Sequence, residues 1–364
     1  MKTIFFTGFP GFLGSELVPR VLARGADVEV VCLVQGKFAG MAARRVAQIE
    51  AQDPAFAGRI RLVEGDITRP GLGLAPEALE ALEAATTEIF HLAAVYDLSV
   101  PRAVGMKVNV DGTRHMLEFA RACRGLARFQ YVSTCYVSGR YAGIFGEDDL
   151  VKGQEFNNFY DETKYLAELD VQAERDKGLP VTIYRPAIVV GDSRTGATQK
   201  YDGPYYVMRW LLKQPVIALM PTVGDTARTR LNLVPRDFVV DAIAYLSTYP
   251  GAVGTVYQLA DPEPLTIDEV IRAMGKATGR AVLTMPLPLT VAKGAIDYVP
   301  GVKGLMEIPS SAIDYFVHPT YYGTTHSVAD LATGGIRVPY LRSYLPTLVD
   351  FMKAHPEISS EAMV

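Results

Sequence analysis

Short apolar segments alternate with segments of helical periodicity through the first half of the chain. The apolar segments have the length of buried parallel strands, and each intervening stretch is long enough for a helix. The segments are Lys2 to Thr7, Val28 to Val34, Ile60 to Glu64, Glu88 to Leu92, Phe129 to Thr134 and Val181 to Tyr184. This alternation predicts an α/β fold of the Rossmann type, a doubly wound parallel sheet with helices on both faces.

The alternation ends near Gly191, after which proline, glycine and aromatic residues become frequent as far as Pro221. We expect the chain to return to the sheet around Leu231 to Val234 and again at Thr255 to Leu259. The pattern therefore predicts a first domain over residues 1–190, with its sheet completed by about 231–260, and a small cap formed by 191–230 and 261–364.

Two helices are predicted in the second part of this cap. They cover Ile267 to Thr278 and Leu345 to Ala354, and Pro346 is expected in the first turn of the second helix, where a missing N–H is tolerated.

The first predicted strand leads into a turn with three glycines at three-residue spacing, Thr7-Gly8-Phe9-Pro10-Gly11-Phe12-Leu13-Gly14. Gly8 allows a tight bend, Gly11 lets a pyrophosphate approach bare backbone, and Gly14 lets the following helix pack closely on the strand. Such a triplet also occurs in ordinary tight turns, but its place between a strand and a helix favours a dinucleotide site. The expected contacts are Gly8, Pro10, Gly11, Phe12, Leu13 and Gly14.

The end of the second predicted strand decides which dinucleotide is preferred. An acid there would hold the 2′-hydroxyl of NAD, yet no acid occurs between Val30 and Gln48, and Lys37, Arg44 and Arg45 follow. We therefore expect NADP(H), with NAD(H) still possible and with contacts from Gln35 and Lys37. The alternative is that these cations form a solvated helix start.

Later strand ends supply further cofactor contacts. Asp66 and Ile67 follow the third strand, where they could hold the adenine, although an Asp in this position is often only a turn residue. Ala93 and Ala94 follow the fourth strand and leave room for the ribose and nicotinamide.

Tyr160 and Lys164 are four residues apart in a predicted helix over Asn157 to Arg175, so both side chains project from one face. An ammonium beside a phenol favours the phenolate and is expected to lower the tyrosine pKa toward neutral. The fifth strand ends in Ser133 and Thr134, whose hydroxyls could bind a substrate oxygen. The alternative is a surface Tyr/Lys pair without a catalytic role. It is disfavoured because the glycine turn, Asp66, the strand-end hydroxyls and the Tyr/Lys helix follow one another along the chain in the expected order.

Composition excludes several classes of function. The 364 residues carry a formal net charge of -4 and no dense block of cations, which argues against a nucleic-acid surface. Three cysteines and five histidines show no metal-ligand spacing, so we expect no metal and a reducing compartment. Met1-Lys2 leads directly into the first strand and no apolar run approaches the ~20 residues of a spanning helix, so a cytoplasmic location without a transmembrane segment is expected.

The predicted cap is rich in apolar residues between Tyr201 and Pro221, including Tyr205, Tyr206 and Trp210. They could line a pocket for a hydrophobic substrate over the reacting carbon, or they could equally be core packing. Transient contact with a membrane surface is a third possibility, although no polybasic face supports it.

Several motifs together resemble the extended short-chain dehydrogenase/reductase family. They are Thr3-Ile4-Phe5-Phe6-Thr7, Asn109-Val110-Asp111-Gly112-Thr113, Tyr184-Arg185-Pro186-Ala187-Ile188-Val189-Val190-Gly191-Asp192 and Leu265-Thr266-Ile267. The resemblance implies a catalytic set of Thr134, with Ser133 as its neighbour, Tyr160 as proton donor or acceptor, and Lys164 on the nicotinamide ribose. It also implies nicotinamide contacts from Pro186, Ile188 and Val189, and a homodimer through the helices around Val104 to Arg121 and Asn157 to Arg175.

Three further segments look most like the fatty acyl and thioester reductase branch, which is male sterility-like. They are Val31-Cys32-Leu33-Val34-Gln35-Gly36-Lys37, Val132-Ser133-Thr134-Cys135-Tyr136-Val137 and Gly191-Asp192-Ser193-Arg194-Thr195-Gly196. Those relatives usually carry Arg where Gln35 stands, so Lys37 would have to compensate.

The function implied by the resemblance is NADP(H)-dependent hydride transfer to or from a carbonyl or alcohol carbon of a hydrophobic substrate, an acyl thioester or aldehyde. A ketone reductase or 3β-hydroxysteroid-type dehydrogenase shares the same catalytic residues. A nucleotide-sugar epimerase or dehydratase, and a non-catalytic NADP-sensing protein, are further alternatives.

Overall fold

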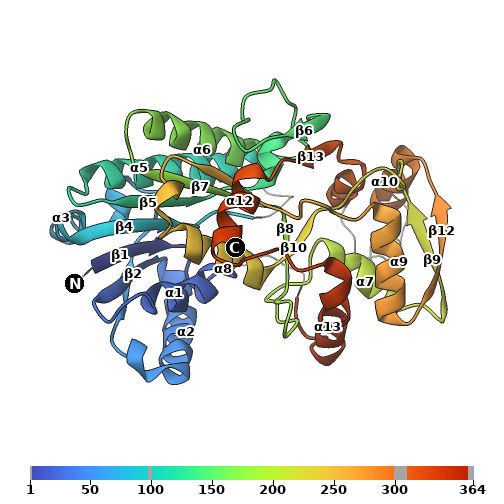
Figure 1. Ribbon diagram of the computed structural model, residues 1–364, viewed down its shortest axis with the longest axis horizontal. Helices are drawn as coiled ribbons and strands as arrows, with labels where there is room; N and C mark the ends of the chain where they lie inside the picture. The colour runs from blue at the N-terminus through green and yellow to red at the C-terminus, as the bar shows by residue number, and fades with distance from the viewer. Residues whose placement is uncertain (1, 97–100, 299–309, 360–364) are drawn as a thin grey trace.

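The computed structural model describes residues 2–96, 101–298 and 310–359 (Figure 1). Its centre is a seven-stranded sheet in the order β11-β7-β5-β4-β1-β2-β3, and every strand pair in it is parallel. The strands are β1 (Lys2–Thr7), β2 (Val28–Val34), β3 (Ile60–Glu64), β4 (Thr86–His91), β5 (Arg128–Val132), β7 (Val181–Pro186) and β11 (Val256–Leu259). The predicted α/β fold of the Rossmann type is confirmed.

Helices cover both faces of this sheet because the strands are apolar on both sides (Figure 1). One face packs against α1 (Gly14–Leu22), α2 (Ala39–Gln52), α8 (Arg236–Leu246) and α12 (Thr325–Thr333). The other face packs against α3 (Pro76–Ala85), α5 (Gly112–Ala122) and α6 (Phe159–Asp176). Short helical segments join these elements: η1 (Gly36–Phe38), η2 (Pro54–Phe56), η3 (Pro70–Gly73), α4 (Arg102–Gly105), η4 (Met106–Asp111), η5 (Cys135–Ser138) and η6 (Pro250–Ala252).

The strand order reverses direction between β1 and β4, the position at which open α/β sheets bind their ligands. Because all strands are parallel, their carboxyl ends lie along one edge. The segments after β1, β2, β3, β4, β5 and β7 therefore gather at that edge, and these segments carry the residues singled out in the sequence.

Beyond this edge lies a second group of elements with its own apolar core, at the right of Figure 1. It contains α7 (Pro204–Leu212), β9 (Ile217–Thr222), α9 (Ile267–Thr278), β12 (Ala281–Pro286), α10 (Leu289–Tyr298) and α13 (Leu341–Ala354). β9 and β12 form a separate parallel pair. Residues 299–309 and 360–364 of the predicted cap lie outside the described residues.

Two short parallel pairs connect the sheet to this second group. β8 (Ile188–Val190) pairs with β10 (Leu233–Pro235), and β6 (Gly143–Phe145) pairs with β13 (Thr320–Tyr322), which follows η7 (Ser310–Val317). The expectation that Leu231 to Val234 returns to the main sheet is wrong, because these residues pair with β8 instead. The return at β11 is confirmed.

Of the two helices predicted in the cap, one has the predicted bounds and the other begins earlier. α9 has the predicted bounds because Thr266 and Glu269 form a capping box at its start and Gly279, in the left-handed region at φ 72°, ends it. α13 begins four residues earlier than predicted, at Leu341, so Pro346 lies inside the helix and not in its first turn. Leu341, Tyr344 and Leu345 are buried and hold this additional turn against the cap core.

A fully buried ion pair joins α6 to the sheet. The Arg185 guanidinium, at the end of β7, donates to the Glu168 carboxylate of α6 from Nη2 at 2.6 Å and from Nε at 3.0 Å, and both side chains are 0% exposed. Glu168 also accepts from the Ser133 hydroxyl at 2.5 Å, after β5. Arg185 further donates to carbonyl oxygens of Gly146, Glu147 and Asp149. The pair thus ties α6, β5, β7 and the segment after β6 together.

We predict that Arg185→Met lowers the free energy of unfolding by about 3–5 kcal/mol, because it leaves the Glu168 carboxylate buried without its charge partner. The double variant Arg185→Met/Glu168→Leu should lose less than the single variant. Chemical denaturation measures both. As a control, Arg114→Met removes an exposed pair with Asp170 and should cost under about 1 kcal/mol. Equal losses in the single and double variants would contradict this account.

Candidate active site

The glycine turn after β1 has the close backbone packing that the sequence predicts. Gly8 has φ 87°, and a Cβ there would lie 2.8 Å from the backbone of Leu92, after β4. A Cβ on Gly11 or Gly14 would lie 2.8 or 2.5 Å from the Gly8 carbonyl oxygen. The turn is therefore a cradle that side chains would fill, and it stands at the start of α1. These features fit a dinucleotide pyrophosphate.

An arginine that the sequence analysis did not single out lies over this turn. The Arg236 guanidinium, at the start of α8, is 5.1 Å from the centre of the Phe12 ring, and the residue is 7% exposed. Its Nη1 is 3.8 Å from a Glu16 carboxylate oxygen, and its Nε has no hydrogen-bond partner among the described residues. A buried N–H without a partner is unfavourable, so the guanidinium fits a nearby phosphate.

The ends of β2 and β3 lie side by side, since Val34 is in register with Glu64. Burial raises the pKa of Asp66, but hydrogen bonds from Thr68 and Gln35 and the charge of Arg69 hold it below its ordinary value. Asp66 Oδ1 accepts from the Thr68 N–H at 2.8 Å, so this carboxylate also organises its own turn.

The neighbouring candidates have different surroundings. The Lys37 ammonium lies 4.9 Å from the centre of the Phe38 ring. Ile67 is buried against Gly112, and its carbonyl oxygen is 2.7 Å from His115 Nδ1. Arg45, one of the predicted cations, pairs with Glu16 at 2.8 Å.

Glu64 is a second residue that the sequence analysis missed. A Cβ on Gly36 would lie 2.7 Å from a Glu64 carboxylate oxygen. An acid thus stands beside the end of β2, supplied by the next strand. A search along residues 30–48 could not find it, although the register of β2 and β3 places it there.

Tyr160 and Thr134 meet at the carboxyl ends of the central strands. The Asn158 side chain caps α6 by accepting from the Asp161 N–H at 2.9 Å, which places Tyr160 in the first turn. Thr134 follows β5, and its hydroxyl donates to the Pro186 carbonyl oxygen at 3.5 Å. The Tyr96 ring packs edge-on against Tyr160 with 5.0 Å between ring centres.

The pKa of Tyr160 is raised and not lowered, contrary to expectation. Burial is the main cause, the neighbouring Asp161 adds to it, and a hydrogen bond with Thr134 opposes it. The Lys164 ammonium points elsewhere: it donates to Tyr131 Oη at 3.0 Å and to the Val132 carbonyl oxygen at 2.8 Å. Burial lowers the pKa of Lys164 to about 7, against the opposing charge of Glu168.

The two candidate hydroxyls have separate surroundings. Ser133 is turned toward Glu168 and belongs to the buried ion pair, whereas Thr134 is turned toward Tyr160. Of the two, Thr134 is in position to contact a substrate oxygen.

The remaining cofactor candidates lie along the same edge. The Ala93 N–H donates to Thr7 Oγ1 at 3.2 Å, and Ala94 is partly buried beside it. Pro186 ends β7 next to Thr134, while Ile188 and Val189 belong to β8 and are partly buried. His91 lies beneath, between Thr7 and Thr113, and burial lowers its pKa to about 3, so it is neutral.

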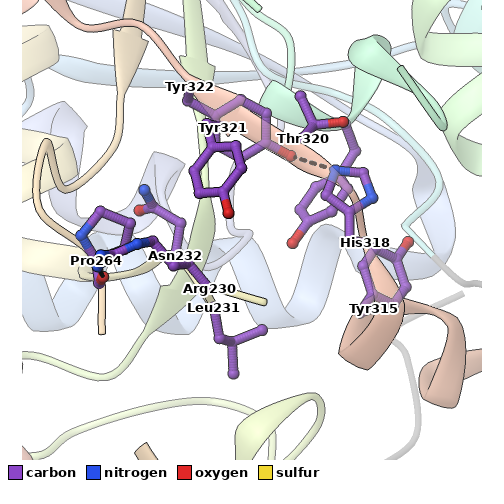
Figure 2. Close-up of a pocket in the computed structure, with 10 residues that line it drawn as sticks. Arg230, Leu231, Asn232, Pro264, Tyr315, His318, Thr320, Tyr321 and Tyr322 are labelled. Atoms are coloured by element: carbon purple, nitrogen blue, oxygen red, sulfur yellow. Dashed lines mark hydrogen bonds between the residues drawn. The ribbon is translucent and has the colours of Figure 1, made fainter. Parts of the chain in front are cut away.

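A pocket opens beside Tyr136, two residues after Thr134. Figure 2 shows Tyr315 and His318 on one side and Asn232 and Pro264 on the other. Its lining residues are Tyr136, Arg230, Leu231, Asn232, Pro264, Tyr315, His318, Thr320, Tyr321 and Tyr322. His318 is 2.9 Å from Tyr322 Oη through Nε2, and its Nδ1 has no partner among the described residues. The lining of the pocket therefore combines aromatic rings with polar side chains.

The aromatic residues predicted to line a hydrophobic pocket are buried or partly buried against apolar clusters. Tyr205 is 2% exposed within the cap core, where its hydroxyl accepts from the Gly191 N–H at 2.8 Å. Tyr206 packs against Val223 and its neighbours, and Trp210 Nε1 donates to the Leu219 carbonyl oxygen. For Tyr205 the core interpretation holds.

The described residues contain no group of three or more His, Cys, Asp or Glu side chains that could hold a metal. None of the described helices combines the length and the apolar character that crossing a membrane requires.

Comparison with known proteins agrees with this geometry. A family model described as "Male sterility protein" matches residues 6–243. The chain belongs to this family. It is an NAD(P)-dependent oxidoreductase of the extended short-chain dehydrogenase/reductase type, as its motifs suggested.

Curated relatives contain this fold as one part. One of the linear gramicidin synthase subunits of Brevibacillus parabrevis is 32% identical over 285 residues, which cover 75% of this chain and 5% of that protein. A putative fatty acyl-CoA reductase of Drosophila melanogaster is 26% identical over 286 residues, covering 69% of this chain and 52% of that protein. The chain thus spans about half or less of these two relatives.

Solved structures match the whole fold. The terminal R domain from the myxalamid PKS-NRPS biosynthetic pathway is 27% identical, with a TM-score of 0.81 over 98% of this chain and 91% of that one. The reductase domain of a nonribosomal peptide synthetase from Mycobacterium tuberculosis is 20% identical, with a TM-score of 0.72 over 98% and 92%, and shows the same fold.

We predict that Gly8→Ala weakens binding of the nicotinamide dinucleotide by about tenfold or more, which corresponds to about 1.4 kcal/mol. The added Cβ would meet the Leu92 backbone and displace the turn. Gly58→Ala is the matched control, because Gly58 has a similar φ of 70° with nothing within 4 Å of its Cβ position. Fluorescence titration of the reduced dinucleotide measures affinity, and unchanged affinity in Gly8→Ala would contradict the assigned cradle.

Proposed function

We propose that this chain reduces the carbonyl carbon of an acyl thioester or aldehyde, with NADP(H) as hydride donor. The observation that carries the proposal is the meeting of the Thr134 hydroxyl and the Tyr160 phenol at the carboxyl edge of the sheet. A bound nicotinamide would supply the hydride. The residues that would hold it are those of the glycine turn, Arg236, Asp66 and Lys164.

In this mechanism Thr134 donates a hydrogen bond that orients the carbonyl oxygen, and Tyr160 gives its proton to that oxygen as the carbon is reduced. The raised pKa of Tyr160 suits an acid, because the phenol keeps its proton at neutral pH. Lys164 has three N–H donors, and two of them are directed to Tyr131 and Val132. One donor is thus left for a ribose hydroxyl.

The substrate class is supported by the family. The relatives include a gramicidin synthase component, a putative fatty acyl-CoA reductase and the terminal R domain of the myxalamid pathway. A ketone or hydroxysteroid substrate remains the second candidate, since it would use the same Thr134 and Tyr160.

The remaining expectations stay predictions. A homodimer through the helices around Val104 to Arg121 and Asn157 to Arg175 rests on the resemblance, and the domain boundaries at residues 190, 230 and 260 rest on the hydrophobic pattern. A cytoplasmic location and contact with a membrane surface are likewise untested.

We predict that the unmodified chain oxidises NADPH in the presence of acyl thioesters or aldehydes and that Tyr160→Phe reduces turnover by about a hundredfold or more, because the proton donor is lost. Dinucleotide affinity should be retained in Tyr160→Phe. A panel of acyl-CoA thioesters, aldehydes, hydroxysteroids and nucleotide sugars, followed by NADPH absorbance, is the measurement. Near-normal turnover in Tyr160→Phe would defeat the mechanism, and activity confined to nucleotide sugars would defeat the substrate class.

We predict that Lys37 and Glu64 act in opposite directions on cofactor choice, because they bring opposite charges to the end of β2. Lys37→Glu should lower the preference for NADPH over NADH, and Glu64→Gln should raise it, each by about tenfold, the effect of about 1.4 kcal/mol. Affinities for the two dinucleotides are compared by titration. Gln48→Glu on the exposed side of α2 controls for a general change of charge, and equal preference in all variants would refute the assignment.

A further inference from the structure

Asp161 is a buried carboxyl group in the first turn of the catalytic helix, directly after Tyr160. It is 0% exposed. Its Oδ2 accepts from the Asn158 side-chain amide at 3.1 Å, and its Oδ1 accepts from the Tyr315 hydroxyl at 3.3 Å. Tyr315 belongs to η7, more than 150 residues further along the chain, and it also accepts from Asn158 at 3.0 Å. Two neutral donors from different parts of the fold therefore hold this carboxyl in place.

The described side chains that bind the Asp161 carboxyl directly are an amide and a phenol, and neither is a cation. The Tyr136 ring, from η5, packs edge-on against Tyr315 with 4.7 Å between ring centres. Among the described residues Asp161 forms no ion pair, and the ammonium of Lys164, one turn later, is directed to Tyr131. The phenols and imidazole around the carboxyl and the Tyr160 phenol are Tyr96 after β4, Tyr136 of η5, Tyr315 of η7, His318 before β13 and Tyr322 of β13. Beyond Tyr96, the Lys200 ammonium lies 5.4 Å from the centre of the Tyr96 ring and pairs with Asp202 at 2.9 Å.

The charge of Asp161 depends on pH in the range where an enzyme works. Burial raises its pKa to about 8, while the hydrogen bonds from Tyr315 and Asn158 oppose the rise. As pH increases, Asp161 therefore loses its proton before Tyr160 does. The resulting negative charge opposes formation of a second negative charge on the adjacent phenol.

We propose that Asp161 is a positioning residue that keeps the Tyr160 phenol protonated as pH rises, so that the proton donor of the reduction is retained to higher pH. The inference rests on the role of Tyr160 in the proposed function. In the reduction, the Tyr160 O–H bond breaks and its proton joins the carbonyl oxygen, while the dinucleotide supplies the hydride to carbon. The phenolate that this step leaves on Tyr160 takes up a proton from solvent before the next turnover, and the charge of Asp161 favours that return.

The test is a pH titration of the Tyr160 phenol in the purified chain. Phenolate absorbance is recorded for the unmodified protein and for Asp161→Asn, and each titration is repeated in the Tyr160→Phe background so that the difference isolates one tyrosine. Asn is nearly isosteric with Asp and can still accept from Tyr315, but it carries no charge. We expect the Tyr160 midpoint to fall by about one pH unit in Asp161→Asn, a tenfold easier loss of the proton.

Two further variants separate charge from structure. Tyr315→Phe removes a donor to the carboxylate but leaves its charge, and Asp161 still ionises before Tyr160, so the Tyr160 midpoint should change less than in Asp161→Asn. Glu162→Gln is the matched control, because it removes a carboxylate from the same helical turn that pairs with Arg102 and is partly exposed. Its Tyr160 midpoint should not change.

The activity profile gives a second measurement. With an active carbonyl substrate, the loss of reduction at high pH should begin at lower pH in Asp161→Asn than in the unmodified chain. An unchanged or higher Tyr160 midpoint in Asp161→Asn would overturn the proposal. A lowered midpoint in a chain that reduces no carbonyl would support this role of Asp161 and count against the proposed function.

Discussion

The buried pair of Arg185 and Glu168 fixes α6 against the sheet. A charge pair removed from water is stable only when its partners and remaining hydrogen bonds are in place, so neither residue can move independently. Glu168 lies four residues after Lys164 and eight after Tyr160 on α6, and Arg185 directly precedes Pro186. The pair therefore places Lys164 and Tyr160 relative to the ends of β5 and β7. Ser133 completes the same network, which leaves Thr134 as the hydroxyl that faces Tyr160.

Most of the sheet could be predicted from the sequence because its signals are local. Apolar runs such as Val28–Val34 and the Gly8 turn depend on neighbouring residues, and the capping box of α9 lies within four positions. The return at Leu233–Pro235 was misassigned because a three-residue apolar strand does not specify its partner, and β8 competes with the main sheet for it. The predicted position of Pro346 in the first turn is wrong because burial of Leu341 and Tyr344 extends α13 toward its N-terminus, beyond the start that local propensity indicates.

The sequence predicts candidate site residues, but it does not predict the electrostatic environment in which the structure places them. Thr134, Tyr160 and Lys164 follow from spacing, order and resemblance. The direction of the Lys164 ammonium does not, because Tyr131 and the Val132 carbonyl compete for it. Glu64, Arg236 and Tyr315 come from other strands and helices, so their approach to Gly36, Phe12 and Asp161 has no signal in the linear sequence.

The contacts of Tyr315 have a consequence for synthesis of the chain. Asn158 and Asp161 form hydrogen bonds with Tyr315, which follows them by 157 and 154 residues. Likewise, β6 can pair with β13 only after this later region has been synthesised. A nascent chain that has emerged only as far as β11 contains every strand of the large sheet but not Tyr315, which contacts the first turn of α6. Domains form during synthesis from the N-terminus onward. The sheet and its glycine turn can therefore assemble first, and the first turn of α6 acquires its final surroundings only when the segment around Tyr315 has been made.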